Sequence, residues 1–171
     1  MKTIWTIGHS TRDLEEFFHL LKTFGIELLV DVRHYPGSRK FPQYNKENMA
    51  SALPQNGFEY QHIVELGGRR KADPDSKNDA WRLASFRGYA DYMETNEFKT
   101  ALNDLEEIAS KQRTAIMCSE AVWWSCHRSM IADALKVEGW EVLHIMNDKT
   151  ATEHPYTAPA KVVDGKLDYS K

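Results

Sequence analysis

Cysteine, histidine, glutamate and arginine gather within eleven residues in the second half of the chain. Cys118 is followed by Glu120, and Cys126, His127 and Arg128 stand in a row a few residues later. A thiolate is a strong nucleophile, histidine and glutamate can carry protons, and arginine binds oxyanions through paired hydrogen bonds. This spacing predicts nucleophilic, redox or acid–base chemistry on a negatively charged group.

Further polar residues stand at or just after the ends of two largely apolar runs, residues 2–7 and 26–32, that have the composition of β-strands. These residues are His9, Ser10, Asp31 and Arg33. A histidine or an aspartate at such a position is a candidate proton carrier, and an arginine is a candidate anion ligand. We therefore count His9 and Asp31 with Cys118, Glu120, Cys126 and His127 as candidate catalytic residues.

Each candidate also has a structural interpretation, which the sequence leaves open. Cys118 ends an apolar run and can be an inert buried thiol. Asp31 can simply pair with Arg33, and His9 can hydrogen-bond a loop carbonyl. Cys126 precedes a predicted helix start, where free backbone N–H groups stabilise a thiolate, so a functional role is favoured there.

Other residues are candidates for holding a ligand. Arg128 and Arg33 are expected to hold an anionic or nucleotide-like ligand, together with Ser10, Arg39, Tyr44, Gly67 and Gly68. The alternative is a nucleic-acid surface on which basic residues touch phosphates and aromatic residues stack on bases. Its members would be Arg39, Lys40, Arg69, Arg70, Tyr44, Trp123 and Trp124.

Metal and nucleotide motifs are weak or missing. Cys118, Cys126, His127 and His9 offer nitrogen and sulfur ligands, but the sequence has no C-x-x-C pair and no H-E-x-x-H helix, so we assign no metal ligand and name no cofactor. It also has no phosphate-binding P-loop and no G-x-G-x-x-G fingerprint. An ordinary nucleotide hydrolase or dinucleotide-dependent enzyme is therefore not expected.

The elements that must position these residues alternate between strand and helix patterns. We expect strands at 2–7, 26–32, 58–63, 114–118 and 141–145, with helices between them. This predicts a single α/β domain over residues 1–148, with a mainly parallel sheet flanked by helices in a Rossmann-like three-layer arrangement. Residues 149–171 form an extension in which Asp164-Gly165 predicts a small hairpin. Ligands bind beyond the carboxyl ends of such strands, so the polar clusters should converge.

Composition limits the setting in which the protein acts. The chain has 171 residues, 42% of them hydrophobic, and a formal net charge of -3, which argues against bulk attachment to nucleic acid or acidic lipid. No apolar run is long enough to span a bilayer, and the N-terminus lacks a signal-peptide core. Two cysteines suit a reducing compartment. We expect a cytoplasmic protein without a membrane partner, in an oligomeric state that the sequence does not indicate.

Several short motifs, taken together, resemble the family called domain of unknown function 488. They are Thr6–Ser10, Asp31–Arg33, Ser38-Arg39 with Phe41, Tyr60 with His62, Leu66–Gly68, Cys118 with Glu120, Cys126–Arg128, and Ile131-Ala132. The likeness runs from about residue 3 to residue 146. It implies an α/β fold with a site built from these motif residues, and it implies no particular reaction.

The sequence therefore supports one leading hypothesis and two alternatives. The leading one is a cysteine- or acid/base-dependent hydrolase or transferase that acts on an anionic small molecule or nucleotide-like substrate. The alternatives are a non-catalytic nucleic-acid-binding module and an enzyme that processes bases in nucleic acid. Loss of ligand binding with unchanged folding is the result expected for Arg128→Ala.

Overall fold

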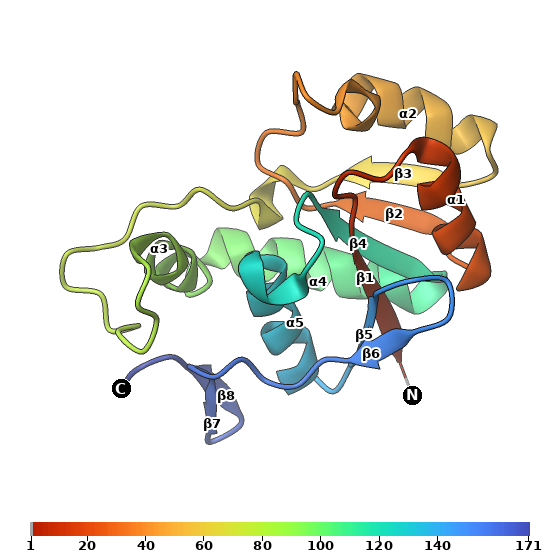
Figure 1. Ribbon diagram of the computed structural model, residues 1–171. Coiled ribbons are helices and arrows are strands. Elements are labelled where there is room, and N and C mark those ends of the chain that lie inside the picture. Colours follow the sequence, from red (N-terminus) through yellow and green to blue (C-terminus); the bar gives the residue numbers. More distant parts are fainter. Residues whose placement is uncertain (1) are drawn as a thin grey trace.

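The protein has the predicted α/β fold, and its main sheet contains the five expected strands and a sixth, β6, that was not predicted. The computed structural model describes residues 2–171, and the strand order is β3-β2-β4-β1-β5-β6 (Figure 1). Strands β1 to β5 pair in parallel, whereas β6 is antiparallel to β5. The bounds are Thr3–Gly8 (β1), Leu28–Asp31 (β2), Glu59–His62 (β3), Thr114–Cys118 (β4), Glu141–Ile145 (β5) and Ala151–Glu153 (β6).

Helices cover both faces of this sheet (Figure 1). Residues of α1 and α2 pack in one hydrophobic cluster, and residues of α3, α4 and α5 pack in the other. Successive strand residues point to opposite faces, so Ile4 belongs to the second cluster and Trp5 to the first. The helices span Leu14–Thr23 (α1), Lys46–Gln55 (α2), Ala84–Tyr92 (α3), Asn96–Lys111 (α4) and Arg128–Val137 (α5).

A local hydrogen bond explains where α1 begins. The Asp13 side chain accepts the backbone N–H of Glu16 at 2.8 Å and so caps the N-terminus of α1. The Glu16 side chain lies 3.9 Å from that of Arg12. Asn45 precedes α2 without capping it, because its side-chain oxygen accepts the Ser38 N–H at 2.6 Å and so ties down the loop after β2.

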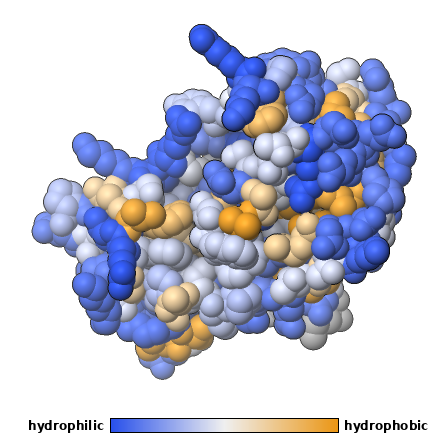
Figure 2. All heavy atoms as spheres, in the orientation of Figure 1, coloured by the Kyte–Doolittle hydropathy of each residue, from blue (hydrophilic) through white to orange (hydrophobic). Residues whose placement is uncertain are grey.

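The segment after β5 returns to the body of the protein. Strands β7 (Lys161–Val163) and β8 (Lys166–Asp168) form the expected hairpin, whose turn residues Asp164 and Gly165 have φ of 52° and 74°. Such left-handed angles suit an Asp-Gly turn. The hairpin forms an apolar patch at the lower edge of Figure 2, where Val162 and Val163 are each 47% exposed. Within residues 2–171, no helix has the length and apolar character needed to cross a membrane.

Candidate active site

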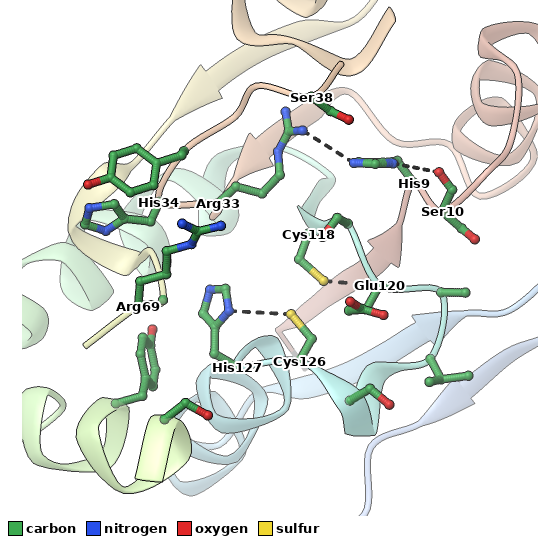
Figure 3. Close-up of a pocket in the computed structure, with 18 of the residues that line it drawn as sticks. His9, Ser10, Arg33, His34, Ser38, Arg69, Cys118, Glu120, Cys126 and His127 are labelled. Atoms are coloured by element: carbon green, nitrogen blue, oxygen red, sulfur yellow. Dashed lines mark hydrogen bonds between the residues drawn. The ribbon is translucent and has the colours of Figure 1, made fainter. Parts of the chain in front are cut away.

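A pocket of about 800 Å³ lies beyond the carboxyl ends of β1, β2 and β4 (Figure 3). Its walls come from the loops that follow these three strands, from the turn at Gly68 and from α3. The structure brings eight of the predicted site residues to this pocket: His9, Ser10, Arg33, Gly68, Cys118, Glu120, Cys126 and His127. Five others do not line it: Asp31, Arg39, Tyr44, Gly67 and Arg128.

Cys126 and His127 form a thiol–imidazole pair in the pocket. The Cys126 sulfur lies 3.5 Å from Nδ1 of His127, and Nε2 of the same ring lies 2.9 Å from the Val32 carbonyl oxygen. A carbonyl oxygen only accepts hydrogen bonds, so Nε2 carries the ring proton. This leaves Nδ1 free to accept the thiol proton, and the Val32 carbonyl holds the ring in place.

The two cysteines, which lie side by side in Figure 3, have opposite pKa shifts. Burial would raise the pKa of Cys126, but hydrogen bonds from the Cys118 thiol and from the Arg128 backbone N–H lower it, helped by the Arg128 charge. Burial raises the pKa of Cys118 well above the usual value. Ionisation is therefore favoured at Cys126 over Cys118. Burial also lowers the pKa of His127, which favours the neutral ring.

Arg128 lies behind the cysteines rather than in the pocket. Its side chain is fully buried, and Nη1 donates to the Cys118 sulfur at 2.8 Å and to the Glu120 carbonyl at 2.7 Å. Nε donates to the Thr6 hydroxyl at 3.2 Å, and Nη2 to the Ala121 carbonyl at 3.3 Å. The role of direct anion ligand expected for Arg128 does not fit this placement. Unchanged folding of Arg128→Ala is no longer expected, because four acceptors would lose their donor.

Asp31 and Arg33 form a buried ion pair at the end of β2. Arg33 Nε lies 2.8 Å from one Asp31 oxygen, and Nη2 lies 2.7 Å from the other. Asp31 is 0% exposed and also accepts the Tyr60 hydroxyl at 2.6 Å, so its carboxylate supports Arg33 from behind the pocket. Arg33 itself lines the pocket, and its Nη1 points toward His9 (Figure 3).

His9 is fixed in its neutral form between Arg33 and Tyr44. Its Nδ1 lies 2.9 Å from the Ser10 carbonyl oxygen and must donate to it, so Nε2 is the acceptor that faces Arg33 Nη1 at 3.4 Å. The ring stacks on Tyr44 at 4.2 Å. Burial, helped by the Arg33 charge and opposed by the Ser10 hydrogen bond, lowers the pKa of His9 to about 4. Tyr44 thus supports His9 from within the core.

This neutral histidine should make the protein less stable in mild acid. The unfolded chain takes up a proton at His9 below its ordinary pKa of 6.5, whereas the folded protein does so only near 4. The free energy of unfolding therefore decreases as pH falls through this window. By linkage, His9 should account for about 1–2 kcal/mol of the decrease between pH 7.5 and pH 5. Urea unfolding of wild type and of His9→Asn at both pH values tests this. The decrease in the free energy of unfolding should be smaller in His9→Asn than in wild type, and it should be unchanged in His19→Gln, which alters an exposed histidine. An equal decrease in wild type and both variants would contradict the role given to His9.

The pocket is also lined by residues that were not predicted as catalytic or ligand-binding, and three of them lie together at one side: His34, Tyr35 and Arg69, the last of which had a place in the alternative nucleic-acid surface. Arg69 is exposed, adopts φ of 61° and lies over the Tyr35 ring at 5.3 Å. Tyr35 is 65% exposed, and His34 lies beside it (Figure 3). The basic run beginning at Arg69 was visible in the sequence, but the sequence pattern did not show that this loop folds back over the strand ends.

The two glycines predicted to bind ligand have packing roles. A Cβ atom on Gly68 would lie 3.1 Å from His127 Nδ1, and one on Gly67 would lie 2.6 Å from the His34 Cα. Gly68 thus leaves room for the imidazole, and Gly67 lets two loops approach each other.

The aromatic residues predicted for a nucleic-acid surface do not form a common platform. Tyr44 is fully buried, and Trp123 stacks on His144 at 4.7 Å. Trp124 is 56% exposed, and Arg39 and Lys40 are exposed without lining the pocket. Within residues 2–171, no three His, Cys, Asp or Glu side chains gather as a metal ion would require.

The fold and the pocket define an α/β protein with a paired-cysteine site at the carboxyl edge of its parallel sheet. The family model described as Domain of unknown function DUF488 matches residues 13–135, more than half of the chain, and the protein belongs to this family. The resemblance seen in the sequence motifs is thereby confirmed. No curated protein and no solved structure gave a match.

Proposed function

We propose that this pocket is the active site of a cysteine-dependent hydrolase or transferase for an anionic small molecule or nucleotide-like substrate. The observation that supports this best is the Cys126 sulfur facing an unprotonated His127 Nδ1, with the other ring nitrogen held by the Val32 carbonyl. A nucleophile, its base and a group that orients the base are the recurring parts of nucleophilic catalysis.

The residues suggest a two-step reaction. Cys126 would give its proton to His127 and form a bond to the electrophilic atom of the substrate, while the leaving group departs with the proton from His127. In the second step His127 would remove a proton from water or from an acceptor, whose oxygen or nitrogen displaces the Cys126 sulfur. Cys118 would stabilise the Cys126 thiolate by a hydrogen bond. Glu120, which is exposed at the pocket, is available for further proton transfer.

The charge around the pocket favours an anionic substrate. Arg33 uses Nε and Nη2 to bind Asp31, so Nη1 is the nitrogen that remains to contact a ligand in the pocket. Arg69 is exposed at the rim and has only the Tyr35 ring as a described contact. An arginine and an exposed aromatic ring side by side suit a substrate that carries both an acidic group and a flat ring, as a nucleotide does.

Competing alkylation of Cys126 by iodoacetate and iodoacetamide tests this proposal. The two reagents differ mainly in charge, and a positive pocket raises the local concentration of the anion. The rate with iodoacetate divided by the rate with iodoacetamide is expected to be about tenfold higher at Cys126 than for the thiol of glutathione. The pH profile of alkylation should show a pKa of Cys126 below that of a free thiol. Peptide mass mapping separates Cys126 from Cys118.

Two controls make the outcome specific. Arg69→Gln should remove most of the preference for iodoacetate while leaving the reaction with iodoacetamide unchanged. Inorganic phosphate should protect Cys126 from iodoacetate in wild type more than in Arg69→Gln. A ratio equal to that of glutathione would rule out the anion site, and a Cys126 that reacts only after unfolding would rule out the nucleophile.

A further inference from the structure

A chain of buried polar side chains links Arg128 to Asp133, two residues of α5, by way of residues from β1, from β5 and from the segment after β6. Arg128 Nε donates to the Thr6 hydroxyl at 3.2 Å, and the Thr6 hydroxyl lies 2.5 Å from His144 Nδ1. His144 Nε2 lies 2.8 Å from His154 Nδ1, and His154 Nε2 lies 2.8 Å from Asp133. All five side chains are 1% exposed or less.

The two ends of this chain have fixed hydrogen-bond directions. An arginine only donates, so Arg128 donates to Thr6, and the Asp133 carboxylate accepts from His154 Nε2 as well as from the Thr157 and Tyr169 hydroxyls at 2.6 and 2.7 Å. Burial lowers the pKa of His144 to about 2, and the neighbouring His154 and Arg128 charges act in the same sense. A neutral His144 donates through one ring nitrogen and accepts through the other, so it links Thr6 to His154. Buried hydrogen bonds connected in this way strengthen one another.

The other side of Arg128 leads to the pocket. Nη1 donates to the Cys118 sulfur at 2.8 Å, the Cys118 thiol donates to the Glu120 carbonyl at 3.8 Å, and the Cys118 sulfur lies beside that of Cys126 (Figure 3). The titratable or charged groups that face Cys126 are Cys118 of β4, Glu120 of the following loop, His127 and Arg128 at the start of α5, and Tyr89 of α3. Arg128 is the cation of this set, so its position affects the thiolate most directly.

We propose that Thr6, His144, His154 and Asp133 are positioning residues that hold Arg128 against Cys118 and thereby set the reactivity of Cys126. This inference rests on the proposed function of Cys126. It assigns a role to four residues that do not line the pocket: Thr6 of β1, Asp133 of α5, His144 of β5 and His154, which follows β6. A network that only stabilised the fold would leave the acidity of Cys126 unchanged.

The test compares the pH profile of iodoacetamide alkylation at Cys126 in variants of Thr6 and His144. Thr6→Val keeps the shape of the side chain and removes the hydroxyl, whereas Thr6→Ser keeps the hydroxyl. His144→Phe keeps a ring stacked on Trp123 and removes both nitrogens. Thr6→Val and His144→Phe are expected to raise the apparent pKa of Cys126 and to slow alkylation at pH 7 by about threefold to tenfold, since one pKa unit is a tenfold change in thiolate.

Thr6→Ser should retain the wild-type profile. Val142→Ala serves as the packing control, because Val142 is buried in β5, the strand of His144, and takes no part in the chain. Suppose that the pKa of Cys126 in wild type lies below that of a free thiol, but that the pH profile of alkylation is the same in Thr6→Val and His144→Phe. This result would overturn the inference and leave the proposed function intact. An equal shift in Val142→Ala would overturn it too. A wild-type Cys126 without a lowered pKa would instead refute the proposed function.

Discussion

Asp31→Ala is expected to lower the free energy of unfolding by about 3–5 kcal/mol, the cost of leaving one member of a buried ion pair without its partner. Arg33 is 8% exposed, and its contacts to Asp31 at 2.7 and 2.8 Å satisfy two of its three nitrogens. The variant would also release the Tyr60 hydroxyl from its acceptor. Urea unfolding monitored by circular dichroism at pH 7 measures the effect.

Tyr60→Phe is the matched control for this prediction. It removes a single hydrogen bond to Asp31 and leaves the ion pair in place, so the loss should be about 1–2 kcal/mol. If Asp31→Ala costs no more than Tyr60→Phe, Arg33 must find water in the pocket once its partner is gone. That result would contradict the structural role given to Asp31 here.

Gly8→Ala is expected to cost about 3 kcal/mol or more and to disrupt the pocket, because overpacking against backbone cannot be relieved by a side-chain rotation. A Cβ atom at this position would lie 1.6 Å from the carbonyl oxygen of Glu120 and 2.8 Å from Arg128 Nη1. The loop after β4 would have to move away from β1. The measurements are the thermal unfolding midpoint and the alkylation rate of Cys126 in the folded fraction.

Gly37→Ala provides the comparison within the same pocket. Gly37 lines the pocket, and an added Cβ would meet no atom within 4 Å. The unfolding midpoint should stay close to that of wild type, as for most surface substitutions. A stable Gly8→Ala protein with normal Cys126 reactivity would show that the contact between β1 and the Glu120 loop is looser than the structure has it.

The fold was predictable from the sequence where a local pattern decides it. Continuous apolar runs such as Leu28–Asp31 and Thr114–Cys118 are typical of strands buried on both faces, and the helices between them make parallel pairing the expected outcome. The short antiparallel strand β6 was missed, because Ala151–Glu153 has no apolar alternation and is held only by pairing with β5.

The site was predictable in place but not in the roles of its residues. Strand ends in a parallel sheet must share an edge, which is why His9, Cys118 and Cys126 could be placed together. Sequence does not show how deeply a side chain is buried. Arg128 was therefore given the role of anion ligand, although its guanidinium is used entirely inside the protein. The hydrogen-bond network of His144 could not be predicted either, because no spacing pattern connects His144 with His154 or with Thr6, which is 138 residues away in the chain.

The anchoring of α5 by the last part of the chain has a consequence for biosynthesis. Asp133 is completely buried, and its oxygens are bonded by His154, Thr157 and Tyr169, all of which are translated after α5. While the ribosome still holds this segment, the nascent α5 carries a carboxylate without its donors. We therefore expect the start of this helix to settle into its final structure only after residues 154–169 have left the ribosome.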